Sequence, residues 1–314
     1  MKRKTLKLNV LPLLIAGVLS VHSPSAMAIG ELVNLGSYLG EGVYSGDPHG
    51  IATAINDDGT VIVGGGWETG SSTAWRFTAS TGYENLELNS VGISASIAYD
   101  VSQYGDVVVG SAITSAGEFA FRWTAATGLV NIGTLGGIYA AAYGVNSDGS
   151  KIVGESQISV HNDPDNFEGS HAFLWHNNSM TDLGTLGGRN SVAYSISKNG
   201  NVVVGESETG AIHSIKGHQI TKAFKSDTNT NGMIVLDSLP AGGPEASSVA
   251  NGVNFDGSVI VGASEHTFAN HAVRWTPAGI QDLHGAVGEY SEAFNVNYAG
   301  DVIVGSMDTL AGAG

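Results

Sequence analysis

The chain has 314 residues, of which 45 are glycine and none is cysteine, and its formal net charge is −16 at pH 7. Hydrophobic residues make up 42% of the chain, enough for a packed core, which argues against a disordered protein. The absence of cysteine excludes disulfides, thiolate metal sites and a cysteine nucleophile, and the acidic balance argues against a nucleic-acid partner.

The N-terminus has the pattern of a secretory signal peptide. A basic start (residues 2–4) precedes an apolar stretch (residues 10–21), and Ala26-Met27-Ala28 forms a small-x-small cleavage site. The apolar stretch is shorter than the ~20 residues that a membrane span needs, and no later segment is long and apolar enough. We therefore predict a signal peptide at 1–28, a repeat domain at 29–314 with no transmembrane segment, and a secreted, periplasmic or cell-surface location.

The rest of the chain contains six copies of one unit. In the first copy, the turn Asn56-Asp57-Asp58-Gly59 is followed by Val61-Ile62-Val63-Gly64. Each copy has an alanine seven residues before its turn glycine, a β-branched residue four before it and a small polar residue three before it. The turn glycines are Gly59, Gly105, Gly149, Gly200, Gly257 and Gly300.

This pattern predicts a β-hairpin in each copy. The polar side chain is expected to bond the backbone two or three residues further on, and the glycine to take a positive φ. The Val/Ile run does not alternate with polar residues, so we expect a strand that is buried on both faces.

Two further strands follow in each copy. One has the pattern Ala-apolar-Arg-Trp, as at Ala120–Trp123 and Ala272–Trp275, and the other has an apolar residue, then Asn or Asp, then an apolar residue, as at Val130–Ile132. The repeated Asn/Asp is expected to bond the backbone. Four short strands in about 45 residues are typical of a propeller blade. The sequence predicts an all-β propeller of about six four-stranded blades, with a parallel β-helix as the alternative.

The last blade is predicted to be incomplete. The strand with the Ala-apolar-Arg-Trp pattern, or a variant of it, is found in only five copies, because its sixth copy would begin beyond Gly314. The N-terminal segment 32–35 carries the Asn/Asp strand pattern and is expected to complete this blade.

The third and fourth copies carry the most specific motifs. They contain His171-Ala172-Phe173-Leu174-Trp175, then Asp182–Gly188, then the Asn199-Gly200 turn with Val202–Gly205. These residues resemble the HAF repeat family of bacterial extracellular proteins, and the resemblance covers residues 32–305. It implies an exported propeller. It brings no established catalytic residues, and some repeats of the family lie in autotransporter passengers.

One loop has the start of a calcium-binding pattern. Asp227, Asn229 and Asn231 precede Gly232 at the spacing of alternating oxygen ligands, whereas the twelfth position is Ser238 instead of glutamate. These three residues are the metal candidates, and calcium is the only cofactor considered. The alternative is a polar hairpin with Asn231-Gly232 as its turn.

Two insertions, 155–170 and 206–221, join the same pair of strands in successive copies. We therefore expect them at one end of the ring, on neighbouring blades, where loops on a rigid scaffold present a binding surface; the alternative is that they are tolerated insertions. The candidate contact residues in these loops are Asp163, Asp165, Phe167, Glu168, His213, Lys216 and His218.

His171 and His271 occupy one repeat position, where other copies have Thr73, Phe119 and Lys222, so a structural role is favoured over a metal site.

The sequence contains no recognised catalytic motif. A G-x-S-x-G elbow and an H-E-x-x-H helix are both absent, so no catalytic residues are predicted. The sequence favours an exported binding or adhesion-like module for a surface glycan, a protein or an envelope component. The alternatives are a hydrolase or lyase that uses the central funnel of the ring, and a truncated autotransporter passenger. The funnel lining distinguishes binding from catalysis.

Overall fold

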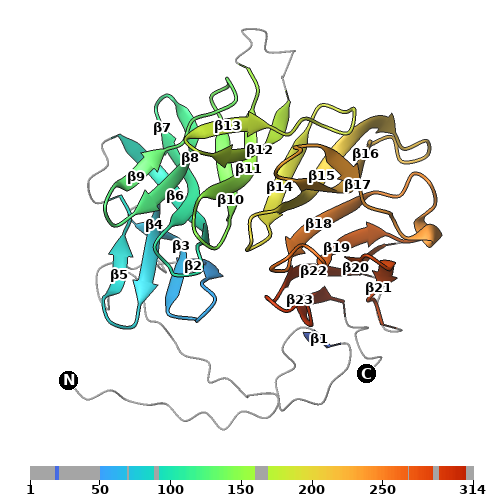
Figure 1. Ribbon diagram of the computed structural model, residues 1–314. Coiled ribbons are helices and arrows are strands. Elements are labelled where there is room, and N and C mark those ends of the chain that lie inside the picture. The colour runs from blue at the N-terminus through green and yellow to red at the C-terminus, as the bar shows by residue number, and fades with distance from the viewer. Residues whose placement is uncertain are drawn as a thin grey trace, which may run out of the picture.

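The computed structural model describes residues 18–20, 50–68, 71–87, 92–159, 169–267, 269–285 and 290–308. These residues form six antiparallel sheets that follow one another in chain order around a central axis (Figure 1). Five sheets have four strands, and the last sheet, β1-β23-β22, has three. The chain is therefore an all-β propeller of six blades. Every pair of neighbouring named strands in the first five blades runs antiparallel, which excludes the parallel β-helix.

The blades are numbered in chain order, and each of the first five runs from its first strand near the axis to its fourth strand at the rim. The strands of blades 1 to 3 are β2 (Gly50–Ile55), β3 (Val61–Glu68), β4 (Ser71–Thr78) and β5 (Gly82–Asn85); β6 (Ile93–Val101), β7 (Val108–Thr114), β8 (Gly117–Thr124) and β9 (Gly128–Asn131); and β10 (Ala140–Val145), β11 (Lys151–Gln157), β12 (Ser170–His176) and β13 (Ser179–Asp182). Those of blades 4 to 6 are β14 (Ser191–Ile196), β15 (Val202–Ile212), β16 (Gln219–Asp227) and β17 (Met233–Val235); β18 (Ser248–Val253), β19 (Ile260–Glu265), β20 (Asn270–Thr276) and β21 (Gly279–Asp282); and β22 (Ser291–Val296), β23 (Val302–Met307) and β1 (Val18–Ser20).

The turn between the first and second strands is the same in all six blades. Its glycine has a φ between 69° and 81°, as predicted. The polar residue three positions earlier accepts a hydrogen bond from the backbone N–H five residues further on, at 2.8 to 3.0 Å. The side chain therefore spans the whole base of the hairpin, from Asn56 to Val61 in blade 1, which is a longer reach than the predicted two or three residues. In blade 6, Asn297 also accepts from the N–H of Gly300, three residues further on, as predicted.

The second glycine of each copy lies beside a β-bulge. A Cβ at Gly110 would lie 2.0 Å from the carbonyl oxygen of Ile97, and one at Gly154 would lie 1.9 Å from that of Ala141. At this height the register of the first strand shifts by one residue in every blade, so each first strand contains one extra residue. The extra residues are Thr53, Tyr99, Tyr143, Tyr194, Asn251 and Phe294.

The hydrophobic core is divided among the blade interfaces. Five clusters of buried residues each join two consecutive blades, and Phe121, Phe173 and Phe224 of the third strands are fully buried. Within the described residues, no such cluster joins blade 6 to blade 1. Accordingly, Val302 and Val304 of β23 are 43% and 46% exposed, whereas the Val/Ile runs of blades 1 to 5 are buried or half-buried, as predicted.

The predicted incompleteness of the last blade is confirmed within the described residues. Blade 6 contains only two strands of its own repeat, and β1 pairs with β23 in the position of a third strand, Leu19 opposite Ile303. β1 lies in the segment predicted to be a signal peptide. The segment 32–35, expected to complete this blade, lies outside the described residues.

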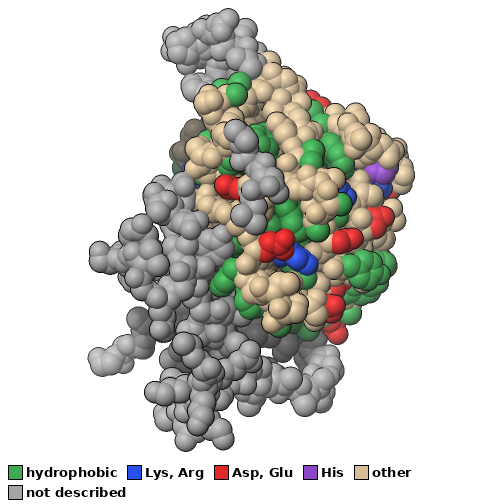
Figure 2. Space-filling view, turned by 90° about the vertical axis from the view of Figure 1, so that its left-hand side faces the viewer, with side chains coloured by type: hydrophobic (Ala, Val, Ile, Leu, Met, Phe, Trp, Pro, Cys, Tyr) green, Lys and Arg blue, Asp and Glu red, His purple; other side chains and the backbone are tan. Residues whose placement is uncertain are grey.

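The described surface is acidic. In the side view of Figure 2, red acidic side chains are scattered over the surface and blue basic ones are few, in agreement with the net charge of −16. No helix in the described part of the chain has the length and hydrophobicity required to cross a membrane.

Candidate functional site

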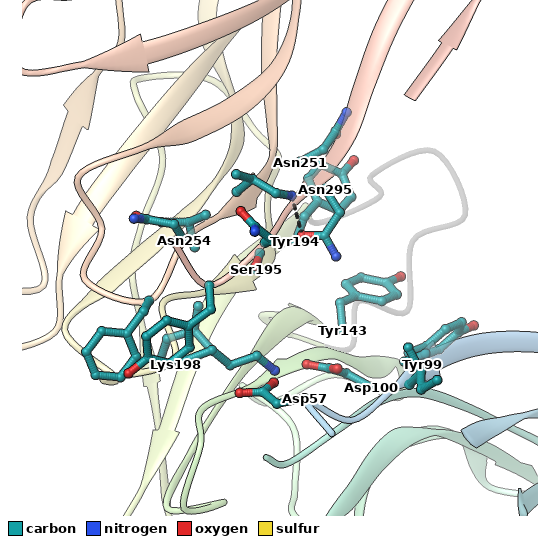
Figure 3. Close-up of a pocket in the computed structure, with 18 of the residues that line it drawn as sticks. Asp57, Tyr99, Asp100, Tyr143, Tyr194, Ser195, Lys198, Asn251, Asn254 and Asn295 are labelled. Atoms are coloured by element: carbon teal, nitrogen blue, oxygen red, sulfur yellow. Dashed lines mark hydrogen bonds between the residues drawn. The ribbon is translucent and has the colours of Figure 1, made fainter. Parts of the chain in front are cut away.

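The propeller encloses a cavity of about 660 Å³ on its axis. Its walls are the first strands of all six blades together with the turns that follow four of them, so the cavity opens at the end of the ring that carries these turns (Figure 3). This end is called the turn end below. The opposite end, which carries the connections between second and third strands and between blades, is called the loop end.

The β-bulges supply much of the cavity wall. A bulge turns its extra residue away from the regular alternation of the strand, and five of the six bulged residues line the cavity: Thr53, Tyr99, Tyr143, Tyr194 and Asn251. The rings of Tyr99 and Tyr143 meet edge to face at 5.1 Å, and those of Tyr143 and Tyr194 lie 6.2 Å apart. Three neighbouring blades therefore present a continuous row of aromatic rings.

Glutamates hold these rings in place. The hydroxyl of Tyr143 donates to Glu155 Oε1 at 2.7 Å, and that of Tyr194 donates to Glu206 Oε1 at 2.8 Å. Burial raises the pKa of both tyrosines, and the carboxylates that they face add to this effect. Burial also raises the pKa of Glu206, and the nearby charges of Glu292 and Glu155 act in the same direction. The hydroxyls thus stay protonated as donors at neutral pH.

The mouth of the cavity is lined by turn residues. Each follows the polar residue that closes the hairpin, and together they are Asp57, Lys198, Phe255 and Tyr298. The rings of Phe255 and Tyr298 stack at 4.3 Å, although Tyr298 is 52% exposed. Figure 3 shows Lys198 on the same side of the cavity as Asp57 and Asp100. Asp100 accepts backbone N–H bonds from Val101 and Val145 at 2.8 and 2.9 Å, so it also maintains the fold.

The repeat itself distinguishes framework from site. The alanine before each bulge and the turn glycine are the same in all six copies, whereas the bulged residue and the turn residue after the polar cap vary from copy to copy. Because these positions vary among structurally equivalent blades, the fold does not require one residue type there. Because they also converge on one cavity, they are candidates for contacts with a ligand. Sequence analysis missed these residues, although the two variable columns of the self-alignment contain the signal that could have found them.

Of the predicted contact residues of the insertions, His213, Lys216 and His218 lie at the loop end. Asp163, Asp165, Phe167 and Glu168 lie outside the described residues. The two insertions do join the second and third strands of the neighbouring blades 3 and 4, as predicted. Most of residues 206–221 extends the β15–β16 hairpin instead of forming a loop.

The tip of the β15–β16 hairpin is tied to the following blade. His213 Nδ1 lies 3.4 Å from Glu245 Oε2, and Lys216 forms an ion pair with Glu265. The ring of His218 lies 5.3 Å from that of His213. These side chains therefore brace blade 4 against the strand and loop of blade 5.

The predicted calcium loop is a hairpin turn between β16 and β17. Asp227 Oδ1 accepts hydrogen bonds from the backbone N–H and the side-chain amide of Asn229, at 2.8 and 3.0 Å. Asn231 adopts a left-handed φ of 54°, and its N–H donates to the carbonyl of Asp227 at 2.9 Å. The polar-hairpin alternative describes this geometry, and calcium binding by these residues stays a prediction.

The two histidines at the shared repeat position each contact an aspartate. His171 Nδ1 lies 2.8 Å from Asp182 Oδ2, and His271 Nδ1 lies 2.9 Å from Asp282 Oδ2. The aspartates also bond the backbone two residues further on, as predicted for the repeated Asn/Asp: Asp182 Oδ1 accepts from the N–H of Gly184 at 2.7 Å.

Comparisons with known proteins define the fold and no more. No protein-family model and no curated protein sequence matches the chain. Among solved structures, it is similar to the putative TolB from Agrobacterium tumefaciens, with 10% identity and a TM-score of 0.54 over 84% of this chain and 91% of that one. It is also similar to the oligogalacturonate lyase from Vibrio parahaemolyticus, with 11% identity and a TM-score of 0.54 over 85% of this chain and 73% of that one.

The β-propeller domain of the Trilobed protease from Pyrococcus furiosus gives 11% identity and a TM-score of 0.50, over 80% of this chain and 74% of that one. The chain spans 52% of the length of TolB from Acinetobacter baumannii. The names of these proteins describe different kinds of protein. At such low sequence identity, their similarity to this chain shows the propeller fold alone.

Proposed function

We propose that this chain is an exported bacterial binding module that takes a polyhydroxylated ligand, such as the end of a surface glycan, into the axial cavity at its turn end. The resemblance of its repeats to the HAF family supports export and an extracellular role. The ligand would belong to an envelope or to another extracellular surface.

The observation that carries this proposal is the exposed aromatic pair at the mouth. Tyr298 and Phe255 stack on each other with an angle of 21° between their rings, while Tyr298 remains 52% exposed. Both residues line the same cavity as the bulged tyrosines. An aromatic face offers apolar surface to the C–H groups of a sugar ring, and this one is left open to solvent.

Polar groups suited to hydroxyls line the same cavity. Asn251 can accept through Oδ1, because its Nδ2 already donates to Glu292 and Ala293. Asn295 can donate through Nδ2, because its Oδ1 already accepts from the N–H of Val296, and Asp57 and Lys198 add one acceptor and one donor. The volume of about 660 Å³ lies within the range of about 300 to 1,000 Å³ that is common for small-ligand sites. Aromatic faces and amides in a pocket of this size fit a short saccharide.

The carboxylates near the axis favour binding over catalysis. A hydrolase or lyase would need acid and base groups that face the substrate within hydrogen-bond reach. Here both oxygens of Asp100 accept backbone amides, and Glu155 and Glu206 accept tyrosine hydroxyls. These contacts hold these three carboxylates as parts of the wall, and Asp57 at the mouth is the remaining carboxylate of the lining.

A glycan array probed with protein purified from expression of the full chain tests the proposal. We expect binding to a defined set of saccharides, and calorimetry on the best of them should give at least about tenfold weaker affinity for Tyr298→Ala. Tyr104→Ala is the matched control, because Tyr104 is 73% exposed on another turn of the same end but does not line the cavity. No bound saccharide, equal effects of both variants, or cleavage of the bound saccharide would each overturn the proposal.

Export has its own test. Expression of the full chain in a Gram-negative host, followed by mass spectrometry of the periplasmic fraction, should give a protein that begins at Ile29. Recovery of the uncleaved chain from the cytoplasm alone would contradict export without bearing on the cavity.

A further inference from the structure

Three histidines and an aspartate gather at the loop end of blade 5. His271 lies at the start of β20 and Asp282 at the end of β21, while His266 follows β19 and His284 follows β21. The imidazole of His271 lies between the other two, with ring centroids 4.1 Å from His266 and 4.0 Å from His284. The group is separate from the axial cavity, to which none of these four residues contributes.

The donor atoms of this group are close enough to share one ion. One ligand atom each from His266, His271 and Asp282 can be chosen so that all three lie within 4.8 Å of one another. Two imidazoles and a carboxylate form a donor set typical of zinc, which takes three protein ligands and leaves a fourth tetrahedral position open. We propose that His266, His271 and Asp282 bind a divalent transition-metal ion such as Zn²⁺. This proposal does not depend on the saccharide site.

The contact between His271 and Asp282 suits a metal ligand. The carboxylate oxygen Oδ2 lies 2.9 Å from Nδ1 of His271, so these two donor atoms already face one point. An ion placed there would be bound by both atoms in place of their hydrogen bond. His284 completes the surroundings of the site, with its Nδ1 2.7 Å from Ser291 Oγ.

Binding requires a change in one imidazole. The rings of His266 and His271 are nearly parallel, with 6° between their planes, so their in-plane lone pairs run side by side instead of converging. His266 lies in the connection between β19 and β20, outside both strands, so its side chain can turn without breaking a strand. We expect that on metal binding the two rings no longer stack, and that a nitrogen of each ring coordinates the same ion.

Blade 3 provides an internal comparison for this site. His171 occupies the position of His271, opposite Ser156 where His271 is opposite Ser264, and contacts Asp182 in the same way. The positions of His266 and His284 are occupied there by Ile158 and Gly184. Blades 3 and 5 thus share the His–Asp pair, whereas the two additional histidines belong to blade 5. The fold does not need them, because blade 3 has the same sheet without them.

Calorimetry with zinc chloride on the untagged full protein, stripped beforehand with a chelator, tests the proposal. We expect one zinc ion per chain, with affinity at least about tenfold weaker in His266→Ala and in His271→Ala. His171→Ala should bind zinc like the unchanged protein. Melting temperatures measured without metal show whether each variant is folded, and His266→Ala decides the outcome if His271→Ala is not.

Any of three results would overturn the proposal. The first is the absence of zinc binding at micromolar concentrations. The second is zinc binding that His266→Ala leaves unchanged, and the third is zinc binding that His171→Ala weakens as much as His266→Ala does, because in both cases the ion would be held elsewhere.

Discussion

The turn end and the loop end of this propeller are built by opposite means. At the turn end, the bulged residues of five of the six blades converge on the axial cavity, because every first strand carries a bulge at the same height. At the loop end, the connections differ from blade to blade, and the histidine cluster lies within blade 5. The repeat therefore offers a saccharide contacts from several blades at the axis, whereas a metal ion, which needs only a few protein side chains, can be held by one blade.

The largest expected effect comes from removing the bulge that shapes the turn end. In Gly154→Ala, the new Cβ would lie 1.9 Å from the carbonyl oxygen of Ala141, so one of the strands must move. We expect a loss of stability of about 3 kcal/mol or more, measured by urea unfolding, or failure to fold. Gly232→Ala is the control, because no atom lies within 4 Å of its Cβ position. Equal stability of the two variants would show that the bulge does not depend on glycine.

A second prediction transfers the blade 5 site to blade 3. Ile158→His should place a third donor beside His171 and Asp182, which already face each other at 2.8 Å. We expect the number of zinc ions bound per chain to rise from one to two in calorimetry, with the new site the weaker. The double variant Ile158→His with His171→Ala should return to one ion. If Ile158→His alone still binds one ion, the position of His266 is not what distinguishes the two blades.

The smallest expected effect is on the pH dependence of stability, through the buried carboxylate of Glu206 near the axis. The pKa of Glu206 is raised above its ordinary value of 4.5, chiefly by burial, so the folded protein binds this proton more tightly than the unfolded chain does. Its contribution to stability therefore falls as the pH rises above 4.5 through the folded pKa. Glu206→Gln removes this loss and keeps an oxygen that accepts from Tyr194.

We expect Glu206→Gln to be more stable than the unchanged protein at pH 8, by less than about 1 kcal/mol. The difference in stability should narrow as the pH falls through the folded pKa of Glu206 towards 4.5. A variant that is less stable at pH 8 than the unchanged protein would show that the hydrogen bonds to the carboxylate outweigh its burial.

The sequence was sufficient to predict the blades but not the site. Turn glycines, Val/Ile runs and the Ala-apolar-Arg-Trp strands repeat because each is needed to form or bury a strand, so the copies could be aligned and the incomplete last blade foreseen. The bulge could not be foreseen, because it depends on the register between two strands. In the sequence, Tyr143 and Tyr194 are therefore indistinguishable from ordinary strand residues, and the binding surface was predicted on the two insertions instead.

The histidine cluster was half visible in the sequence. His271 shares a repeat position with His171, for which the sequence favours a structural role over a metal site. His266 and His284 lie five residues before His271 and thirteen after it. No spacing rule brings them together, because their meeting depends on the paths of two connections at the edge of blade 5.

The structure of the protein with its best-binding saccharide tests the central claim most directly. The account predicts a ligand in the axial cavity at the turn end, in contact with Tyr298 and with the bulged tyrosines Tyr143 and Tyr194. A saccharide bound instead at the loop end, on the insertions 155–170 and 206–221, would contradict it.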